Sequence, residues 1–102
     1  MQTLTYRFPA TVTNGTTTHV GVVASGDLEV LFDATGEAAG VAHVRVRTSV
    51  DGFDTVWQET LARFFEHTPL AGTWELNDFG ATPAVVTLRL RQTAEAATEV
   101  TP

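Results

Sequence analysis

Alternating apolar and polar residues predict β-strands over much of the chain. The clearest case is the segment 41–50, in which Val44, Val46, Thr48 and Val50 share one face and polar side chains share the other. Shorter segments with strand character lie at 4–8, 20–23, 28–32, 74–76 and 85–91. Because Gly26 lies in the four-residue connection between 20–23 and 28–32, we expect these two strands to form a hairpin.

A different spacing begins at residue 53 and predicts one amphipathic helix. Apolar residues recur every three or four positions, at Phe53, Val56, Trp57, Leu61 and Phe64. The dipeptide at 51–52 offers a helix cap, and the proline at 69 ends the helix shortly after residue 67. From residue 92 onward we expect a frayed or weakly helical tail, disordered in part.

Together these segments predict one domain of the α+β class over residues 1–102. We expect an antiparallel-rich β-sheet with one amphipathic α-helix packed on one face, and not a four-helix bundle. A chain of 102 residues is long enough to bury one hydrophobic core.

The composition narrows the classes of partner. Six arginines and no lysine stand against twelve acidic residues, giving a net charge of -6. This charge disfavours nucleic acid and anionic membrane surfaces and favours basic protein partners. No apolar run approaches the length of a spanning helix, so we expect no direct membrane insertion. The N-terminal segment lacks the pattern of a signal peptide, which predicts a cytoplasmic protein.

Catalytic motifs are missing from the sequence. The chain has no cysteine, which excludes disulfides, thiolate metal sites and a cysteine nucleophile. His19, His43 and His67 lack the spacing of a metal site, and we expect surface or helix-cap histidines. No Gly-x-Ser-x-Gly motif is present, so a free-standing hydrolase is disfavoured. Asp27 and Glu29 could form an acid–base pair if buried, but solvated carboxylates are the simpler expectation.

Arginines on two predicted strands allow two interpretations. Arg45, Arg47, Arg89 and Arg91 lie at the polar positions of 41–50 and 85–91. They could form a cross-strand charge ladder with glutamates such as those at 29 and 75, or a docking surface for phosphate or an acidic partner. Phe79, in a predicted loop, and Phe65, at the margin of the helix stripe, are candidate interface anchors that could equally pack against the core edge.

Ser25 lies at the expected tip of the hairpin. A serine in a tight turn commonly bonds the local backbone, but here the hydroxyl could also be a site of modification. Gly26 would let a bulky enzyme or cofactor approach the backbone, and Asp27 could hold a metal–phosphate during attachment. The residues alone leave both interpretations open.

Three blocks of sequence resemble one family. The first block is 20–31 (VGVVASGDLEVL). The second runs from 48–53 (TSVDGF) through Trp57 and Leu61 to 63–65 (RFF). The third is 75–83 (ELNDFGATP), with the apolar positions that follow it up to residue 90. In this order and spacing they resemble the delta subunit of malonate decarboxylase, its acyl carrier protein. The resemblance covers most of residues 20–92.

The resemblance implies a non-catalytic carrier subunit of an enzyme complex that converts malonate to acetate and CO2. It implies that Ser25 carries covalent 2'-(5''-phosphoribosyl)-3'-dephospho-CoA through a phosphodiester, with Gly26 and Asp27 in support. It also implies that acetyl and malonyl groups are carried on this arm as thioesters. The implied partners are an acyl-carrier transferase subunit, carboxy-lyase subunits and a prosthetic-group transferase. An unmodified assembly module of a multisubunit enzyme is the alternative.

Overall fold

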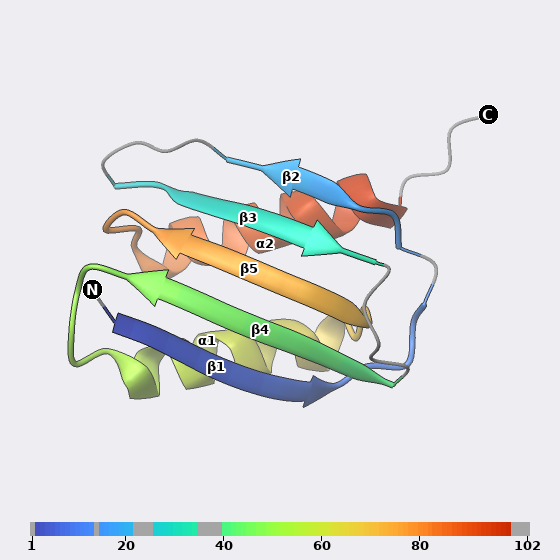
Figure 1. The fold of residues 1–102 in the computed structure, drawn as a ribbon, viewed down its shortest axis with the longest axis horizontal. Coiled ribbons are helices and arrows are strands. Elements are labelled where there is room, and N and C mark those ends of the chain that lie inside the picture. The colour runs from blue at the N-terminus through green and yellow to red at the C-terminus, as the bar shows by residue number, and fades with distance from the viewer. Residues whose placement is uncertain (1, 14, 22–25, 35–39, 99–102) are drawn as a thin grey trace.

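Five strands and two helices form the part of the chain that the structure, a computed structural model, describes: residues 2–13, 15–21, 26–34 and 40–98 (Figure 1). The strands are β1 (Gln2–Pro9), β2 (Thr18–Val20), β3 (Leu28–Asp33), β4 (Val41–Thr48) and β5 (Gly72–Asp78), and the helices are α1 (Asp54–His67) and α2 (Pro83–Thr98). The predicted α+β class is confirmed, whereas the prediction of a single helix is wrong.

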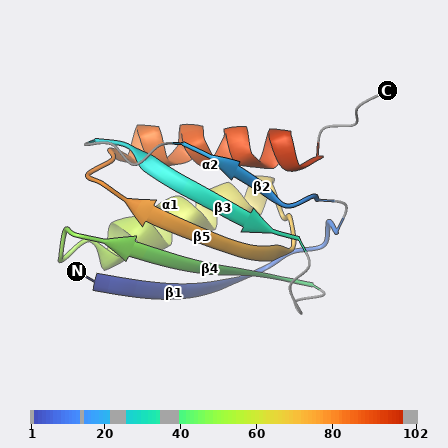
Figure 2. The ribbon, with the colours of Figure 1, turned by 45° about the horizontal axis from the view of Figure 1, so that its top comes forward.

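The strands make one mixed sheet in the order β1-β4-β5-β3-β2. Three neighbouring pairs are antiparallel, so the antiparallel-rich sheet is confirmed. β2 pairs with β3 as a hairpin requires, but it shares only Val20 with the predicted strand 20–23, of which residues 22–23 lie outside the described part of the chain. β4 and β5 are parallel, and α1 provides the crossover connection that a parallel pair requires. Both helices lie on the same face, and the opposite face is open (Figures 1 and 2).

The alternation in β4 separates the core from the open face as predicted. Val44, Val46 and Thr48 are at most 2% exposed and lie on the side of the helices, whereas Arg45 and Arg47 are exposed. The neighbouring strand β5 contributes Trp74, which is fully buried among aromatic rings of α1 and β3. Val50 was expected on the buried face, but it follows the end of β4 and is exposed.

The helix stripe of α1 is shifted relative to the prediction. Trp57, Leu61, Phe64 and Phe65 are its buried residues. Phe65 stacks on Phe8 with ring centroids 5.1 Å apart, so its packing against the core is confirmed.

The start of α1 differs more from expectation. Phe53 and Val56 are 48% and 41% exposed, because they occupy the first turn of the helix at the end of the molecule. The N-cap residue is Phe53, and no side chain caps the helix, so the predicted cap at 51–52 is wrong.

Residues 85–91 form part of α2 and not the predicted strand. Thr82 accepts a hydrogen bond from Val85 N at 3.3 Å, as a helix N-cap does, and Pro83 follows at the first helical position. The buried residues then recur at helical spacing: Val86, Leu90, Thr93, Ala94 and Ala97. The small residues of the segment 92–98 therefore continue the helix, which corrects the expected frayed tail for these positions.

One end of the molecule collects several chain segments that are distant in sequence. β3 begins there, β4 and β5 end there, and both helices begin there, on the left in Figure 1. Residue 26 lies at this end, directly before β3. We call it the attachment end, because it contains the described residues next to the candidate Ser25.

Candidate functional site

Backbone hydrogen bonds join the residues after Ser25 to the turn that follows β5. Ser25 itself lies outside the described residues. Gly26 N donates to the carbonyl of Phe79 at 2.7 Å, and Phe79 N donates to the carbonyl of Asp27 at 3.0 Å. This reciprocal pair continues the β3–β5 ladder beyond its last partners, Leu28 and Asp78. Gly26, Asp27 and Phe79, named separately from the sequence, therefore lie together.

Gly26 is exposed and open toward solvent. Its φ angle is 78°, a conformation that favours glycine. A Cβ atom built at this position would meet no heavy atom of the described residues within 4 Å, apart from those of its chain neighbours. The described residues therefore leave room for a large group beside the backbone of Gly26.

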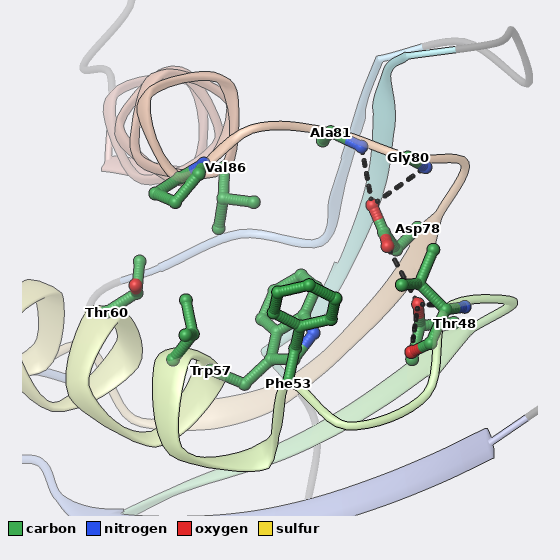
Figure 3. A pocket seen from close by; sticks show the side chains of 11 residues that line it. Thr48, Phe53, Trp57, Thr60, Asp78, Gly80, Ala81 and Val86 are labelled. Carbon is green, nitrogen blue, oxygen red and sulfur yellow. Dashed lines mark hydrogen bonds between the residues drawn. The ribbon is translucent and has the colours of Figure 1, made fainter.

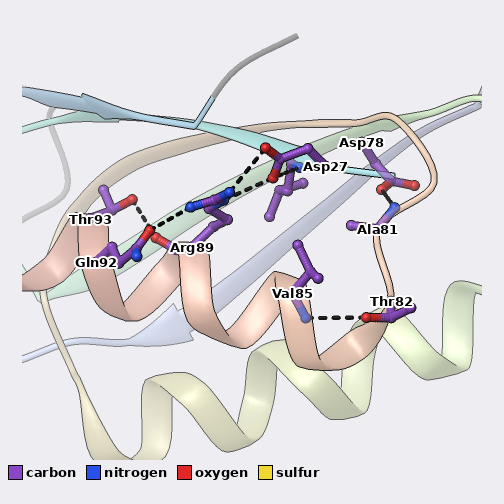
Figure 4. Close-up of polar contacts among 9 residues, drawn as sticks. Asp27, Asp78, Ala81, Thr82, Val85, Arg89, Gln92 and Thr93 are labelled. Atoms are coloured by element: carbon purple, nitrogen blue, oxygen red, sulfur yellow. Dashed lines mark hydrogen bonds and ion pairs between the residues drawn. The ribbon is translucent and has the colours of Figure 1, made fainter. Parts of the chain in front are cut away.

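An ion pair ties Asp27 to α2 (Figure 4). Arg89 Nε and Nη2 donate to the two oxygens of the Asp27 carboxylate at 2.8 and 3.1 Å, and Leu28 N donates to the same carboxylate. The other terminal nitrogen of Arg89 donates to Gln92 at 2.9 Å. The hydrogen bonds from Arg89, and then that from Leu28, lower the pKa of Asp27 below its ordinary value. Asp27 is therefore held as a carboxylate.

The structure corrects two predictions about charged side chains. Asp27 and Glu29 were expected as solvated carboxylates, but their side chains are only 14% and 16% exposed, and Asp27 binds Arg89 while Glu29 binds His19 and Asn77. The structure shows no acid–base pair of the two carboxylates. Arg89 lies on α2, on the opposite side of the sheet from Arg45. The four arginines proposed as one strand surface are therefore split between two faces of the molecule.

Asp78 is the second carboxylate at the attachment end, and it is 7% exposed (Figure 3). The Thr48 hydroxyl donates to one oxygen at 2.8 Å, while Gly80 N and Ala81 N donate to the other at 3.2 and 2.9 Å. Thr48 in turn accepts from Val50 N at 3.1 Å. Asp78 thus fixes the turn between β5 and α2 and links it to the end of β4.

A mostly apolar cavity of about 360 Å³ opens beside this turn, and we call it the end cavity (Figure 3). It lies between the first turns of α1 and α2 and the ends of β4 and β5. Its lining residues are Thr48, Val50, Phe53, Val56, Trp57, Thr60, Asp78, Gly80, Ala81, Pro83 and Val86. Asp78, Gly80 and Ala81 therefore line the cavity, while Phe79 between them bonds Gly26 and Asp27 through its backbone.

The open face of the sheet contains short charge pairs. Arg45 Nη2 donates to Glu75 at 2.6 Å, between residues that are direct partners across β4 and β5. His19 lies 3.1 Å from Glu29. The charge-ladder interpretation is confirmed for Arg45. Arg47 is exposed on the same face and forms no ion pair with a described residue.

The described residues contain neither a metal site nor a membrane-spanning helix. No group of three or more histidines and carboxylates there could hold a metal ion. Neither of the described helices has the length and hydropathy needed to cross a membrane.

Sequence reasoning missed Asp78 and the end cavity. Asp78 was placed in a loop without a role, although an aspartate followed by Gly80 and a Thr-Pro helix start is a signal for a side-chain-stabilised turn. The sequence signal for the cavity was weaker. Phe53 and Val56 precede the buried residues of α1, and nothing in the pattern indicates what would cover them.

Comparison with known proteins identifies the family. The family model described as malonate decarboxylase delta subunit (MdcD) matches residues 15–97. The chain belongs to the malonate decarboxylase delta subunit family. The match contains the whole attachment end, including the segments 26–28, 78–83 and 89–92.

Relatives within this family align over about three quarters of the chain or more. The malonate decarboxylase acyl carrier protein of Burkholderia cepacia is 53% identical over 76 residues, which are 74% of this chain and 68% of that protein. The protein of the same name from Stutzerimonas stutzeri is 47% identical over 96 residues, 93% of this chain and 95% of the relative.

A solved structure shows the same fold. A chain from the crystal structure of a Pseudomonas malonate decarboxylase hetero-tetramer in complex with malonate is 44% identical to this one. It superimposes with a TM-score of 0.84, over 93% of this chain and 97% of that one.

Proposed function

We propose that this chain is the acyl carrier subunit of a malonate decarboxylase, with a prosthetic group attached to Ser25. The observation that supports this most strongly is the family match over residues 15–97, together with relatives named malonate decarboxylase acyl carrier protein that align over almost the whole chain. The proposed domain is the full chain, 1–102, and the proposed location is the cytoplasm.

The proposed prosthetic group is 2'-(5''-phosphoribosyl)-3'-dephospho-CoA, joined to Ser25 by a phosphodiester. When attached, it would supply a thiol that can hold an acyl group as a thioester. The described residues next to the attachment point fit a group of this size, because Gly26 is exposed and the space around it is open. The reciprocal hydrogen bonds between 26–27 and Phe79 hold the two residues that follow Ser25 in register with β5.

Asp27 and Arg89 have a positioning role in this proposal. The ion pair fastens the residue two positions after Ser25 to α2 at 2.8 Å. Because Arg89 lowers its pKa, the Asp27 carboxylate is a poor proton acceptor at neutral pH. In this proposal the pair holds the segment after Ser25, and other subunits perform the chemistry.

The proposed partners are an acyl-carrier transferase subunit, carboxy-lyase subunits and the transferase that attaches the prosthetic group. The structural relative comes from a hetero-tetramer, which supports assembly with other subunits. Arg47, Arg91 and Phe79 remain proposed docking residues. Arg45 could contribute to docking through nitrogens not bound to Glu75, whereas all three side-chain nitrogens of Arg89 already donate to Asp27 or Gln92.

Intact-mass measurement after co-expression with the attaching transferase tests the proposal. The chain has two serines, Ser25 and Ser49, so Ser49→Ala is a matched control for Ser25→Ala. We expect the wild type and Ser49→Ala to gain the mass of one prosthetic group and Ser25→Ala to gain none. A mass gain on Ser25→Ala would exclude this site.

Malonate decarboxylation by the assembled complex separates the carrier from the alternative, an unmodified assembly module. We expect the complex with Ser25→Ala to assemble and to lose decarboxylation, while the Ser49→Ala complex keeps it. Full activity of the Ser25→Ala complex would show that the chain acts in assembly alone.

A further inference from the structure

A groove continues the end cavity along the seam between α1 and α2. The cavity and the groove share Thr60 and Pro83, and the groove has a volume of about 850 Å³. We call it the helix groove; its other lining residues are Arg63, Phe64, His67, Thr68, Ala84, Thr87, Leu88 and Arg91. The two hollows therefore adjoin at Thr60 and Pro83, with the end cavity at the attachment end and the helix groove beyond it between the helices.

The helix groove contains cationic groups without acidic partners. Arg63 comes from α1 and Arg91 from α2, and both are exposed. Neither forms an ion pair with a residue in the described part of the chain, in contrast to Arg45 and Arg89. Two unpaired arginines facing one groove, in a chain with a net charge of -6, favour an anionic ligand with several oxygens.

The end cavity has the opposite character. Phe53 lies half exposed at its rim and Trp57 lines its wall. Asp78 is its single ionisable lining residue, and both carboxylate oxygens already accept hydrogen bonds. Such a site suits a flat, uncharged ring that can stack on aromatic side chains, and it offers no cation to a phosphate.

We propose that the end cavity and the helix groove together hold the adenosine diphosphate part of the nucleotide arm, with the adenine in the cavity and the pyrophosphate on Arg63 and Arg91. This inference rests on the proposed function, because the arm must be attached to Ser25. In that arm the phosphoribosyl unit joins the serine to the adenosine, so the adenosine lies near the point of attachment and the thiol at the far end. Asp78, Gly80 and Ala81 line the cavity, and Phe79 between them bonds Gly26.

The order of the two hollows matches the order of groups along the arm. Beyond the phosphoribosyl link, the uncharged adenine comes first and the pyrophosphate follows, as the neutral cavity comes first and the arginine groove follows. With the nucleotide held between the helices, the remaining pantetheine portion would extend beyond the groove, where partner subunits can reach its thiol.

Titration of the unmodified protein with 3'-dephospho-CoA tests the site without attachment. The two tryptophan indole N–H signals in NMR spectra are the readout: Trp57 lines the cavity, and Trp74, fully buried in the core, is an internal control. We expect the Trp57 signal to shift and the Trp74 signal to stay. Pantetheine, which lacks the nucleotide, should shift neither, and a Trp57 signal indifferent to dephospho-CoA would overturn the proposal.

Arginine variants test the groove in the same titration. We expect Arg63→Gln combined with Arg91→Gln to weaken dephospho-CoA binding by about tenfold or more, because charge-assisted hydrogen bonds to the pyrophosphate are lost. Arg47→Gln, an exposed arginine on the open face, is the matched control and should change the affinity by less than about twofold. Equal affinities of the double variant and the control would refute the role of the groove.

The modified protein separates failure of this site from failure of the proposed function. Intact mass reports attachment, and the Trp57 signal reports occupancy of the cavity. A mass gain with a Trp57 signal identical to that of the unmodified protein would overturn the nucleotide site and leave the carrier function standing. A double variant that binds nucleotide normally but associates poorly with partner subunits would show that the groove docks an acidic protein surface instead.

Discussion

Two aspartates hold the attachment end, and they do so by different means. Asp78 is buried and receives its hydrogen bonds from the Thr48 hydroxyl and from two N–H groups of the turn that follows it. Asp27 is bound by Arg89, which lies 62 positions along the chain, and the pair remains in partial contact with water. The first contact should therefore determine stability, and the second should determine how firmly the segment next to Ser25 is fixed to α2.

Replacement of Asp78 by alanine should have the largest effect. It leaves the buried Thr48 hydroxyl and the turn N–H groups without their acceptor, and we expect a loss of about 2–3 kcal/mol in the free energy of unfolding. Urea denaturation would measure this loss. Asp78→Asn keeps one acceptor oxygen and should lose less; equal losses for the two variants would contradict the hydrogen-bond explanation.

Thr48→Val removes the same network from the other side. The change keeps the shape of the side chain and deletes the hydroxyl, so we expect a loss of about 1–2 kcal/mol. Thr48→Ser, which keeps the hydroxyl, is the control for the hydrogen bond. In a double-mutant cycle with Asp78→Ala the two losses should be less than additive, and strict additivity would show that the two residues act independently.

The difference between these aspartates also shows what sequence can predict. The strand of 41–50 and the helix after 53 were found because their burial follows one period, and the structure confirms both. Gly26 and Asp27 were named because a turn motif and a family resemblance pointed to them. Asp78 was not, because its role depends on Thr48, which is 30 positions away and becomes its neighbour only through the parallel pairing of β4 and β5.

The error at α2 has a similar physical origin. Over 85–91 the apolar residues alternate, and this short window fits a strand as well as one side of a helix. A helix is indicated by the start signal Thr82-Pro83 and by the small buried residues Ala94 and Ala97. This indication is visible only when the whole segment from 82 to 97 is considered. As a result Arg89, which was predicted on the surface of the sheet, lies on α2 and contacts Asp27.

Arg89→Gln should have a smaller effect on global stability than either Asp78 variant and a larger effect on the local stability of residues 26–27, next to Ser25. The loss of the ion pair removes the side-chain tie between Asp27 and α2, so we expect faster hydrogen exchange at Gly26 N–H and little change in the urea midpoint. Added salt should reproduce part of this effect in the wild type. Arg45→Gln, which breaks the pair with Glu75 on the open face, should leave exchange at Gly26 unchanged.

The smallest expected effect is the contribution of Asp27 to the pH dependence of folding stability. Because Arg89 lowers the pKa of Asp27 in the folded state below its ordinary value of 3.8, folding favours the carboxylate. The stabilisation is therefore fully present above the unfolded pKa and is lost as the pH falls through the folded pKa. The wild type and Asp27→Asn should differ by a constant amount in stability above about pH 5, and the difference should shrink in acid. Denaturation curves across this range would measure it, and a difference that grew as the pH fell would reverse the sign and contradict the ion pair as the cause.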